Sequence, residues 1–325
     1  MQRREQYRVD NGAGWELDLA RHVDPDRQDR GLRPVMAVPG YCMNCHILGF
    51  HPRGTSMVES LVGEGFEVWT ANLRGQGGSR RLSGPARYGF GDLALVDLAA
   101  ARAFVSRETT TDAADVDLVG CSLGATVAYT YLAHHPRDHG VGALVNIGGP
   151  LRWNRAHPLL RWASRWPFLY NLMPLRGTRQ LARLAIPVVR QFPWLLGLYM
   201  NPDIIDLSRA DEIAQTIDDP DPRLTMEIAR WVRDRDLVVE SLNISHSLYS
   251  VEVPIQCVIA LQDGIVTPEA ALSVLDHIGS HVIDIVEVGT PEEPHAHADL
   301  FISDGVEERV FEPIAGWLKE QNIDA

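Results

Sequence analysis

The stretch Gly120-Cys121-Ser122-Leu123-Gly124 follows an apolar run at residues 115–119 and precedes a helical-looking stretch at residues 125–133. This order predicts a strand, a tight turn with Ser122 at its tip, and a helix. A side chain at such a tip is lifted above the sheet, at the N-terminus of the helix. The two glycines supply the clearance that the turn needs. The pentapeptide alone is a weak signal, and its placement between strand and helix gives it weight.

The composition is that of a globular protein with a large core, with 325 residues, 45% hydrophobic and 22% charged. A formal net charge of -13 argues against a nucleic-acid partner, because polyanion binding depends on Lys and Arg contacts to phosphate; it fits a neutral or apolar substrate better. No apolar run follows the basic start, and no segment is long and apolar enough to span a membrane. We therefore expect a cytoplasmic protein without stable membrane insertion. Four cysteines predict reduced thiols. The oligomeric state stays open.

Two kinds of sequence pattern divide the chain. Residues 1–150 and 252–325 alternate strands and helices, which is typical of a mostly parallel sheet covered on both faces. Residues 151–251 contain helical segments broken by prolines, and we expect this segment to form a helical cap inserted into the core. Five of the eight tryptophans lie in it: Trp153, Trp162, Trp166, Trp194 and Trp231. Most should form the core of the cap, and some should line an apolar cleft facing the main domain.

The predicted elements of the core are short. Expected strands lie at residues 15–20, 34–38, 66–69, 115–119, 141–147, 255–261 and 282–288, and expected helices at residues 93–105, 125–133 and 306–319. The strand at 15–20 alternates polar and apolar residues, which favours an antiparallel strand. No internal repeat or low-complexity linker interrupts this order.

A serine hydroxyl is a weak nucleophile at neutral pH, so Ser122 needs a histidine to take its proton and a carboxylate to orient that histidine. Asp263 follows the strand at 255–261 and is the candidate carboxylate, although an aspartate before a glycine is also a common turn former. Two histidines, His295 and His297, follow the last strand. We prefer His297, which directly precedes Ala298-Asp299 and the closing helix, and keep His295 as the alternative. The remaining nearby histidines, His277 and His281, are expected at the surface or in packing.

Two other motifs point to different chemistry. The run His295-x-His297-x-Asp299 is similar to the first ligand cluster of the metallo-β-lactamase fold, but that fold needs further ligands downstream and no histidine follows His297. The run Cys42-x-x-Cys45-His46 matches a haem-attachment pattern, yet attachment normally happens outside the cytoplasm. We expect neither zinc nor haem, and no cofactor. Thiol pairing or metal capture by Cys42 and Cys45 stays a minor possibility, and the role of Cys121 is left open.

Several motifs together resemble the α/β-hydrolase superfamily over nearly the whole chain. They are Pro39-Gly40-Tyr41, the stretch Asn72-Leu73-Arg74-Gly75-Gln76-Gly77-Gly78-Ser79, the serine turn, Asp263-Gly264-Ile265-Val266, and His297-Ala298-Asp299. Within the superfamily, the long helical cap is similar to lipase- or esterase-like members and, more distantly, to relatives of polyhydroxyalkanoate synthases. Those synthases carry cysteine where this chain has Ser122, which favours hydrolysis over polymerisation. Pro39, Asn72 and Gln76 replace the histidine, aspartate and histidine that are usual in the family.

The resemblance implies a fold, a site and an activity. The fold would be an eight-stranded, mostly parallel sheet flanked by helices, with residues 1–150 and 252–325 as core and 151–251 as lid. The triad would be Ser122, Asp263 and His297, in the family's order of serine, acid and base. The backbone N–H groups of Leu123 and Tyr41 would form the oxyanion hole.

The activity implied is that of a serine hydrolase acting on a small-molecule carboxylic ester or thioester with an apolar acyl group. Acyl transfer to a bound alcohol or thiol would use the same triad and is an open alternative. A non-catalytic ligand-binding protein of the same fold is another. The sequence does not identify the substrate or its chain length.

Overall fold

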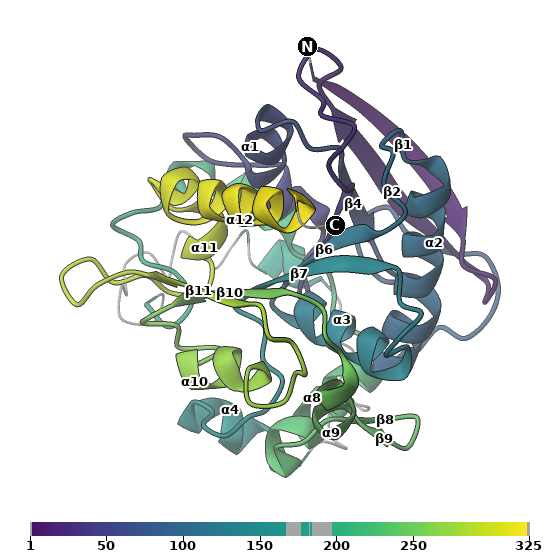
Figure 1. Cartoon of the computed structure of the whole chain (residues 1–325). Coiled ribbons are helices and arrows are strands. Elements are labelled where there is room, and N and C mark those ends of the chain that lie inside the picture. Colours follow the sequence, from purple (N-terminus) through teal and green to yellow (C-terminus); the bar gives the residue numbers. More distant parts are fainter. Residues whose placement is uncertain (1, 167–176, 182, 184–196, 324–325) are drawn as a thin grey trace.

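The computed structural model describes residues 2–166, 177–181, 183 and 197–323. A central sheet runs through the molecule, and helices lie on both of its faces (Figure 1). Helices α1 and α12 lie toward one face and helices α2 and α3 toward the other. Their bounds are α1 (Met57–Gly63), α2 (Ala99–Glu108), α3 (Leu123–His134) and α12 (Glu312–Ile323). This layered arrangement is the one that the alternating pattern predicts.

The sheet has the order β1-β2-β4-β3-β6-β7-β10-β11, with the short β5 paired to β2. The strands are β1 (Arg3–Asp10), β2 (Trp15–Val23), β3 (Val35–Val38), β4 (Val68–Asn72), β5 (Arg80–Arg81), β6 (Val116–Cys121), β7 (Val141–Ile147), β10 (Ile255–Ala260) and β11 (Ile283–Val288). From β4 to β11 every neighbouring pair is parallel, whereas β1, β2 and β5 pair antiparallel. The predicted mostly parallel sheet of eight strands is confirmed, with β5 as a small addition.

Burial explains why the central strands are apolar throughout. All residues of β3, β4, β6 and β10 are buried, because helices cover both faces of the sheet there. Two hydrophobic clusters result, one on each face. The first contains Leu98 and Val105 from the α2 side, and the second contains Leu61 and Leu318 from the α1 and α12 side. Because these strands are parallel, their carboxyl ends meet at one edge of the sheet. Ligands bind at this edge in such sheets.

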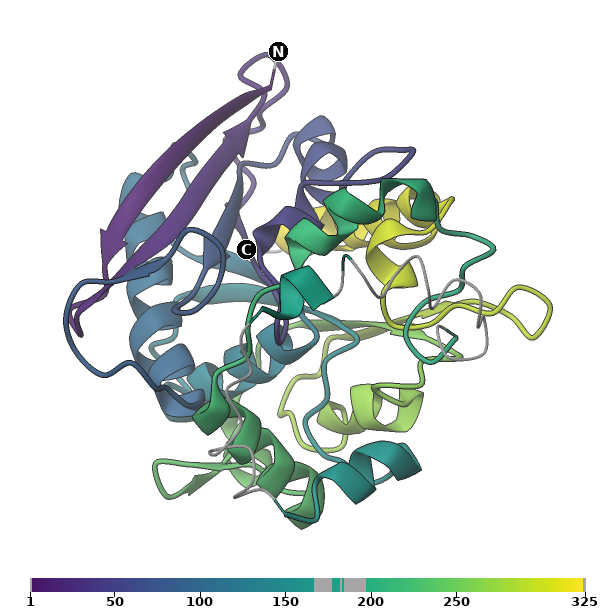
Figure 2. The ribbon, with the colours of Figure 1, turned by 180° about the vertical axis from the view of Figure 1, so that it is seen from behind.

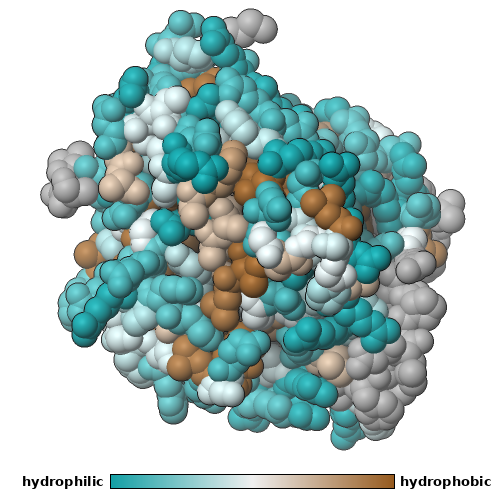
Figure 3. Space-filling view, turned by 90° about the vertical axis from the view of Figure 1, so that its right-hand side faces the viewer, coloured by the Kyte–Doolittle hydropathy of each residue, from teal (hydrophilic) through white to brown (hydrophobic). Residues whose placement is uncertain are grey.

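Strand β1 was not among the predicted strands. Residues 3–10 carry charged or polar side chains at most positions, and only Val9 is buried. The strand pairs along its length with β2 at the edge of the sheet, where one face stays exposed to solvent. Periodicity of hydrophobic residues cannot identify such a strand. The face that carries β1 and α2 is largely hydrophilic, with smaller hydrophobic patches between the polar groups (Figure 3).

The described part of residues 151–251 is mainly helical and lies in front of the sheet in the view from behind (Figure 2). Its elements are α4 (Pro158–Ala163), η4 (Leu207–Arg209), α7 (Ala210–Ile213), η5 (Ala214–Thr216), α8 (Pro222–Asp234), the hairpin β8 (Val238–Val239) and β9 (Leu242–Asn243), α9 (Ile244–Ser247) and η6 (Leu248–Ser250). Helix α8 begins at the N-cap Asp221, which accepts hydrogen bonds from the Arg223 and Leu224 amides. It ends at Arg235, whose φ of 68° lies in the left-handed region.

The tryptophans of this segment divide into two groups. Trp153 and Trp231 are buried and pack edge to face, and Trp231 also contacts Phe90 of the core domain at 5.7 Å between ring centroids. Trp162 and Trp166 are instead 62% and 47% exposed. Trp194 lies outside the described residues. No helix in the described part of the chain is long and apolar enough to cross a membrane.

Candidate active site

Ser122 stands between β6 and α3, at the tip of the predicted turn. Its backbone angles, φ 53° and ψ -120°, are unfavourable for a residue with a side chain. The Ser122 N–H donates to the Ile147 carbonyl at 2.7 Å, which ties the turn to the end of β7. A Cβ atom at Gly120 would collide with Ala125, and one at Gly124 would collide with the Val38 carbonyl. Both glycines are therefore required by close packing around the turn.

Cys121, the neighbour of Ser122, is the last residue of β6 and is fully buried. Burial raises the pKa of its thiol, so the thiolate is disfavoured. Ser122 itself is only half-buried. The hydroxyl, and not the thiol, is the accessible nucleophilic group at the tip.

Asp263 and His297 form a direct hydrogen bond. His297 Nδ1 lies 2.5 Å from Asp263 Oδ2, and both side chains are buried. The other carboxylate oxygen of Asp263 accepts hydrogen bonds from the Ile265 and Val266 amides, each at 2.8 Å. These two amides hold the carboxylate so that its second oxygen faces the imidazole. The turn following β10 therefore positions Asp263 for a specific contact.

The surroundings of His297 act on its protonation in opposite directions. Burial lowers the pKa of the imidazole, but the adjacent Asp263 carboxylate and its hydrogen bond raise it, and the net pKa is raised above 6.5. The Tyr199 ring lies 6.1 Å from the imidazole, centroid to centroid. A hydrogen bond at Nδ1 leaves Nε2 as the nitrogen free to exchange a proton with a reacting group.

His295 lies elsewhere. Its Nδ1 is 3.0 Å from the Glu293 carbonyl, and its Nε2 is 3.1 Å from the Arg309 guanidinium. The two histidines thus contact different partners, and His297 is the one at Asp263. Within the described residues no group of three or more His, Cys, Asp or Glu side chains is arranged as a metal site.

The loop that carries both histidines is fixed by two groups outside the predicted set. Asp299 accepts hydrogen bonds from the Ala296 amide at 2.7 Å and from the Asn201 amide. Gln262 and His295 are paired twice, through the Gln262 N–H to the His295 carbonyl and the His295 N–H to the Gln262 side chain, both at 3.0 Å. Asp299 is visible in the sequence only as the third member of the H-x-H-x-D run. Its burial raises its pKa to about 7, despite the amides that favour the carboxylate.

Ser122 and His297 approach the same short turn, Gly148–Gly149, after β7. A Cβ atom at Gly148 would lie 3.2 Å from His297 Cε1, and one at Gly149 would collide with the Ser122 carbonyl. The loops after β6, β7, β10 and β11 therefore bring the serine, the acid and the histidine to one edge of the sheet. In the described part of the chain no hydrogen bond joins Ser122 to His297.

The loop after β3 lies against the serine turn. A Cβ atom at Gly40 would be 2.9 Å from Ser122 Cβ. Among the described residues, the N–H groups of Tyr41 and Leu123 have no protein acceptor. The Tyr41 hydroxyl is 2.6 Å from Thr225 of α8, which attaches this loop to the 151–251 segment. A cavity of about 20 Å³ lies between these groups, enough for about one water molecule.

The unusual residues Asn72 and Gln76 contact this loop. Gln76 Nε2 donates to the Gly40 carbonyl at 3.1 Å, and its Oε1 accepts from the Leu73 amide at 2.9 Å. Asn72 Oδ1 accepts from the Cys45 amide at 2.8 Å. The substituted side chains therefore hold the loop that contains Tyr41 by hydrogen bonds from both ends.

Comparison with known proteins agrees with this geometry. A family model described as the alpha/beta hydrolase fold matches residues 33–187. The chain has the α/β-hydrolase fold, and the family model supports its membership of that superfamily. A search of curated proteins found no match.

Three solved structures illustrate the range of the fold. A thermophilic esterase from Thermogutta terrifontis has a TM-score of 0.59 and 18% identity, covering 98% of this chain and 99% of that one. A proline iminopeptidase from Mycobacterium smegmatis has a TM-score of 0.61 and 16% identity, with 98% and 99% coverage. A loop variant of a haloalkane dehalogenase from Bradyrhizobium elkanii has a TM-score of 0.62 and 16% identity, with 100% and 98% coverage. Since these titles describe different reactions, the likeness shows the α/β-hydrolase fold alone.

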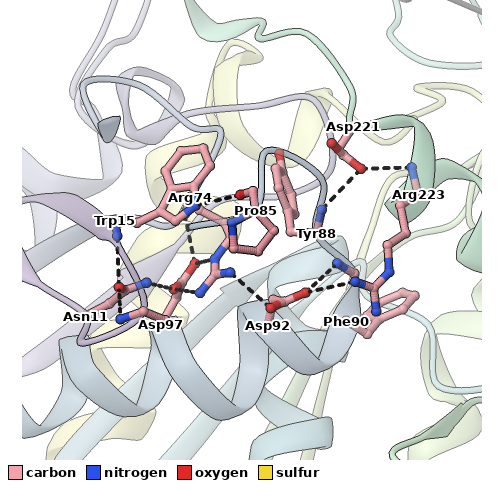
Figure 4. A network of polar contacts seen from close by, with 12 residues as sticks. Asn11, Trp15, Arg74, Pro85, Tyr88, Phe90, Asp92, Asp97, Asp221 and Arg223 are labelled. Atoms are coloured by element: carbon pink, nitrogen blue, oxygen red, sulfur yellow. Dashed lines mark hydrogen bonds and ion pairs between the residues drawn. The ribbon is translucent and has the colours of Figure 1, made fainter. Parts of the chain in front are cut away.

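A buried network supports the loop of this α/β-hydrolase that follows β4 (Figure 4). Arg74 is 1% exposed and its guanidinium contacts Asp97 at 2.7 Å and Asp92 at 3.0 Å. Asp97 also accepts from the Asn11 side chain at 2.6 Å. Asp92 lies 3.6 Å from the Arg223 guanidinium of α8. The network therefore connects the loop after β4 to the 151–251 segment.

The cysteines near this loop are free thiols. Burial raises the pKa of Cys42 to about 12 and that of Cys45 well above its ordinary value. Cys42 has a φ of 56°, and its carbonyl accepts from the Asp218 amide. The C-x-x-C-H run of the sequence thus forms a buried loop that packs against the 151–251 segment.

Proposed function

We propose that this α/β-hydrolase is a serine hydrolase that cleaves a carboxylic ester or thioester with an apolar acyl group. The observation that carries the proposal is the buried hydrogen bond between Asp263 and His297 at the sheet edge where Ser122 occupies its strained turn. A base held by a buried carboxylate, next to a serine at a helix N-terminus, is the arrangement that activates a hydroxyl for acyl transfer.

The chemistry follows from the positions of the hydrogen-bonding atoms. The Asp263 carboxylate accepts a hydrogen bond from the His297 Nδ1–H and so favours the tautomer in which Nε2 carries no proton. Nε2 takes the Ser122 hydroxyl proton as the oxygen attacks the substrate carbonyl, and then delivers it to the leaving alcohol or thiol. A water molecule loses a proton to the same nitrogen as it attacks the acyl-enzyme, and His297 then returns this proton to the Ser122 oxygen as the acid is released. The enzyme ends in its initial protonation state.

The oxyanion of each tetrahedral intermediate would be held by the Leu123 and Tyr41 amides. Neither N–H has a protein acceptor among the described residues, so both are available donors. Preorganised backbone donors are worth about 3 kcal/mol each when they stabilise developing charge. The close approach of Gly40 to Ser122 supports the Tyr41 amide lying near the Leu123 amide, so that both could donate to the same oxygen.

The small cavity beside the oxyanion loop has a mixed lining. Leu93, Val127 and Leu224 contribute apolar surface to it, and Arg74, Asp218 and Asp221 contribute charged groups. Neither Ser122 nor His297 lines this cavity, so its volume of about 20 Å³ does not limit the acyl chain. We propose that this segment is a cap over the site, and that residues 1–150 and 252–325 form the catalytic core.

Two measurements test the proposal. A fluorophosphonate probe should label Ser122 in the folded protein, and the label should be located by peptide mass spectrometry. Hydrolysis of p-nitrophenyl esters of increasing chain length should then show a preference for medium or long acyl chains. Labelling elsewhere, or no labelling of folded protein, would contradict the catalytic role of Ser122. Activity on the acetate ester alone would contradict the apolar acyl pocket.

A further inference from the structure

A second cavity lies on the 151–251 segment, away from the serine turn. It measures about 500 Å³ and lies between α4 and the C-terminal end of α8, which are in contact with each other (Figures 1 and 2). Its lining includes Trp153, Arg155, Arg161, Arg165, Arg233 and Arg235. No acidic residue of the described chain is part of the lining. Five arginines thus surround one concave site in a protein whose net charge is -13.

Most of this positive charge has no partner. Arg155 is paired with Glu269 at 2.8 Å, and Arg233 with its neighbour Asp234 at 2.7 Å. For the described residues, the structure gives the side chains of Arg161, Arg165 and Arg235 no acidic partner. Like charges gathered around one cavity repel each other, and an anionic ligand would relieve that repulsion.

One residue of the lining, Trp153, carries a buried donor. Trp153 is 6% exposed, lines the cavity, and its indole N–H has no acceptor within the described residues. A buried donor without an acceptor costs about 1–3 kcal/mol, and is usually satisfied by water or by a bound group.

We propose that this arginine cavity binds a phosphate-bearing ligand. Guanidinium groups match phosphate oxygens with paired hydrogen bonds, and several of them favour a group that carries two or more negative charges. The volume of the cavity accommodates a phosphate together with the organic group to which it is attached. This inference does not depend on the catalytic proposal, because it concerns a separate site.

Two sources could present such a phosphate. One is a free phosphorylated metabolite, and the other is the head group of an anionic phospholipid. Trp162 and Trp166 lie beside Arg161 and Arg165 and are exposed, and exposed indoles also occur at lipid interfaces. The shared chemistry is the phosphate, and the experiment separates the sources.

The test measures binding to the purified full-length chain by two routes. Isothermal titration calorimetry uses inorganic pyrophosphate as the probe, and co-sedimentation uses phosphatidylcholine vesicles with and without phosphatidylglycerol. The variant is the double substitution Arg161→Gln/Arg235→Gln. The matched control is Arg81→Gln, an exposed arginine on β5 at the opposite part of the sheet. Thermal melting checks that each variant is folded.

Saturable pyrophosphate binding that weakens by about tenfold or more in the double variant, and is unchanged in the control, would support a free phosphorylated ligand. Sedimentation only with phosphatidylglycerol vesicles, lost in the double variant and reduced by Trp162→Ala, would support a lipid head group. If wild type binds neither probe, or if the control loses binding as much as the double variant does, the proposal is wrong.

Discussion

The arginines at the sheet edge and those on the outer face of the 151–251 segment differ in burial and in pairing. Arg74, beside the oxyanion loop, is buried and contacts two carboxylates. Arg161, Arg165 and Arg235, at the outer cavity, are exposed and have no acidic partner among the described residues. The same contrast holds for the other polar groups: Asp263 and Asp299 each accept several hydrogen bonds, whereas the Trp153 indole N–H has none within the described chain.

The contrast indicates different roles for the two regions. Fully paired groups fix a geometry, since each buried polar atom with a partner resists displacement. Charged side chains without a partner around a cavity do not fix a geometry, and they are available to bind a ligand. We therefore expect substitutions at the sheet edge to affect catalysis and stability, and substitutions at the outer cavity to affect binding alone.

The largest effect is expected from Ser122→Ala. Removing the nucleophile should lower kcat for p-nitrophenyl ester hydrolysis by about 10⁴-fold or more, because no other accessible group can form the acyl-enzyme. Circular dichroism and thermal melting should show a folded protein. Cys121→Ala is the control and should retain activity, because that thiol is buried. Loss of activity in Cys121→Ala together with an active Ser122→Ala would contradict our assignment of the nucleophile.

Asp263→Asn should lower kcat by about 10³- to 10⁴-fold at neutral pH. An amide cannot accept the Nδ1 proton and leave Nε2 free in the same way, so His297 would adopt the wrong tautomer. The matched control is Asp284→Asn, an aspartate on β11 that contacts Gln256 and lies away from the histidine loop. An Asp263→Asn enzyme with nearly full kcat would show that another group orients His297.

Arg74→Met tests the paired side of the comparison through stability. Without the guanidinium, Asp97 stays fully buried next to Asn11 with an uncompensated charge, and the free energy of unfolding should fall by about 3–5 kcal/mol. Arg161→Met, at the outer cavity, should change it by less than about 0.5 kcal/mol. Urea denaturation measures both. An equal decrease in the free energy of unfolding in both variants would mean that the two groups of arginines do not differ in their contribution to stability.

The pH dependence of kcat/KM tests the pairing of His297 directly. The histidine must be neutral to act as a base, and its pKa is raised above 6.5, so the rate should fall as the pH decreases through a value above 6.5. In Asp263→Asn, burial would still lower the pKa of the imidazole, and only the weaker influence of Asp299 would still raise it. The acidic limb of the residual activity should therefore move to lower pH. If the acidic limb of the pH profile stays at the same pH in Asp263→Asn, the carboxylate does not set the pKa of His297.

Much of the fold could be predicted from the sequence, because the central strands follow strong local signals. The strands that are buried on both faces are continuous apolar runs, and β7 has the predicted bounds of residues 141–147. The serine turn is marked by its two glycines. Edge strand β1 was missed because its exposed face is charged, and no periodicity reveals it.

The candidate site shows the same limit. The contact between His297 and Asp263 joins residues 34 positions apart, and only the following Ala298-Asp299 and the closing helix favour His297 over His295 in the sequence. The supporting contacts of Asp299 with Asn201 and of Gln76 with Gly40 are also nonlocal. The outer cavity forms from arginines of two separate segments, residues 155–165 and 233–235, so the gathering of their charge becomes visible only after folding.

The smallest expected effect concerns Gln76, which links the loop after β4 to the carbonyl preceding Tyr41. Gln76→Leu removes its hydrogen bonds to Gly40 and Leu73 while keeping a similar volume, so stability should fall by only about 1–2 kcal/mol. If the Tyr41 amide stabilises the oxyanion, its displacement should lower kcat by about tenfold and leave KM nearly unchanged. The control Gln28→Leu, at a side chain that bonds Glu67 and Thr110 away from the loop, should leave kcat unchanged. A Gln76→Leu enzyme with normal kcat and reduced stability would mean that the Gln76 hydrogen bonds contribute to stability alone. The oxyanion loop would then be held mainly by its contacts with α8.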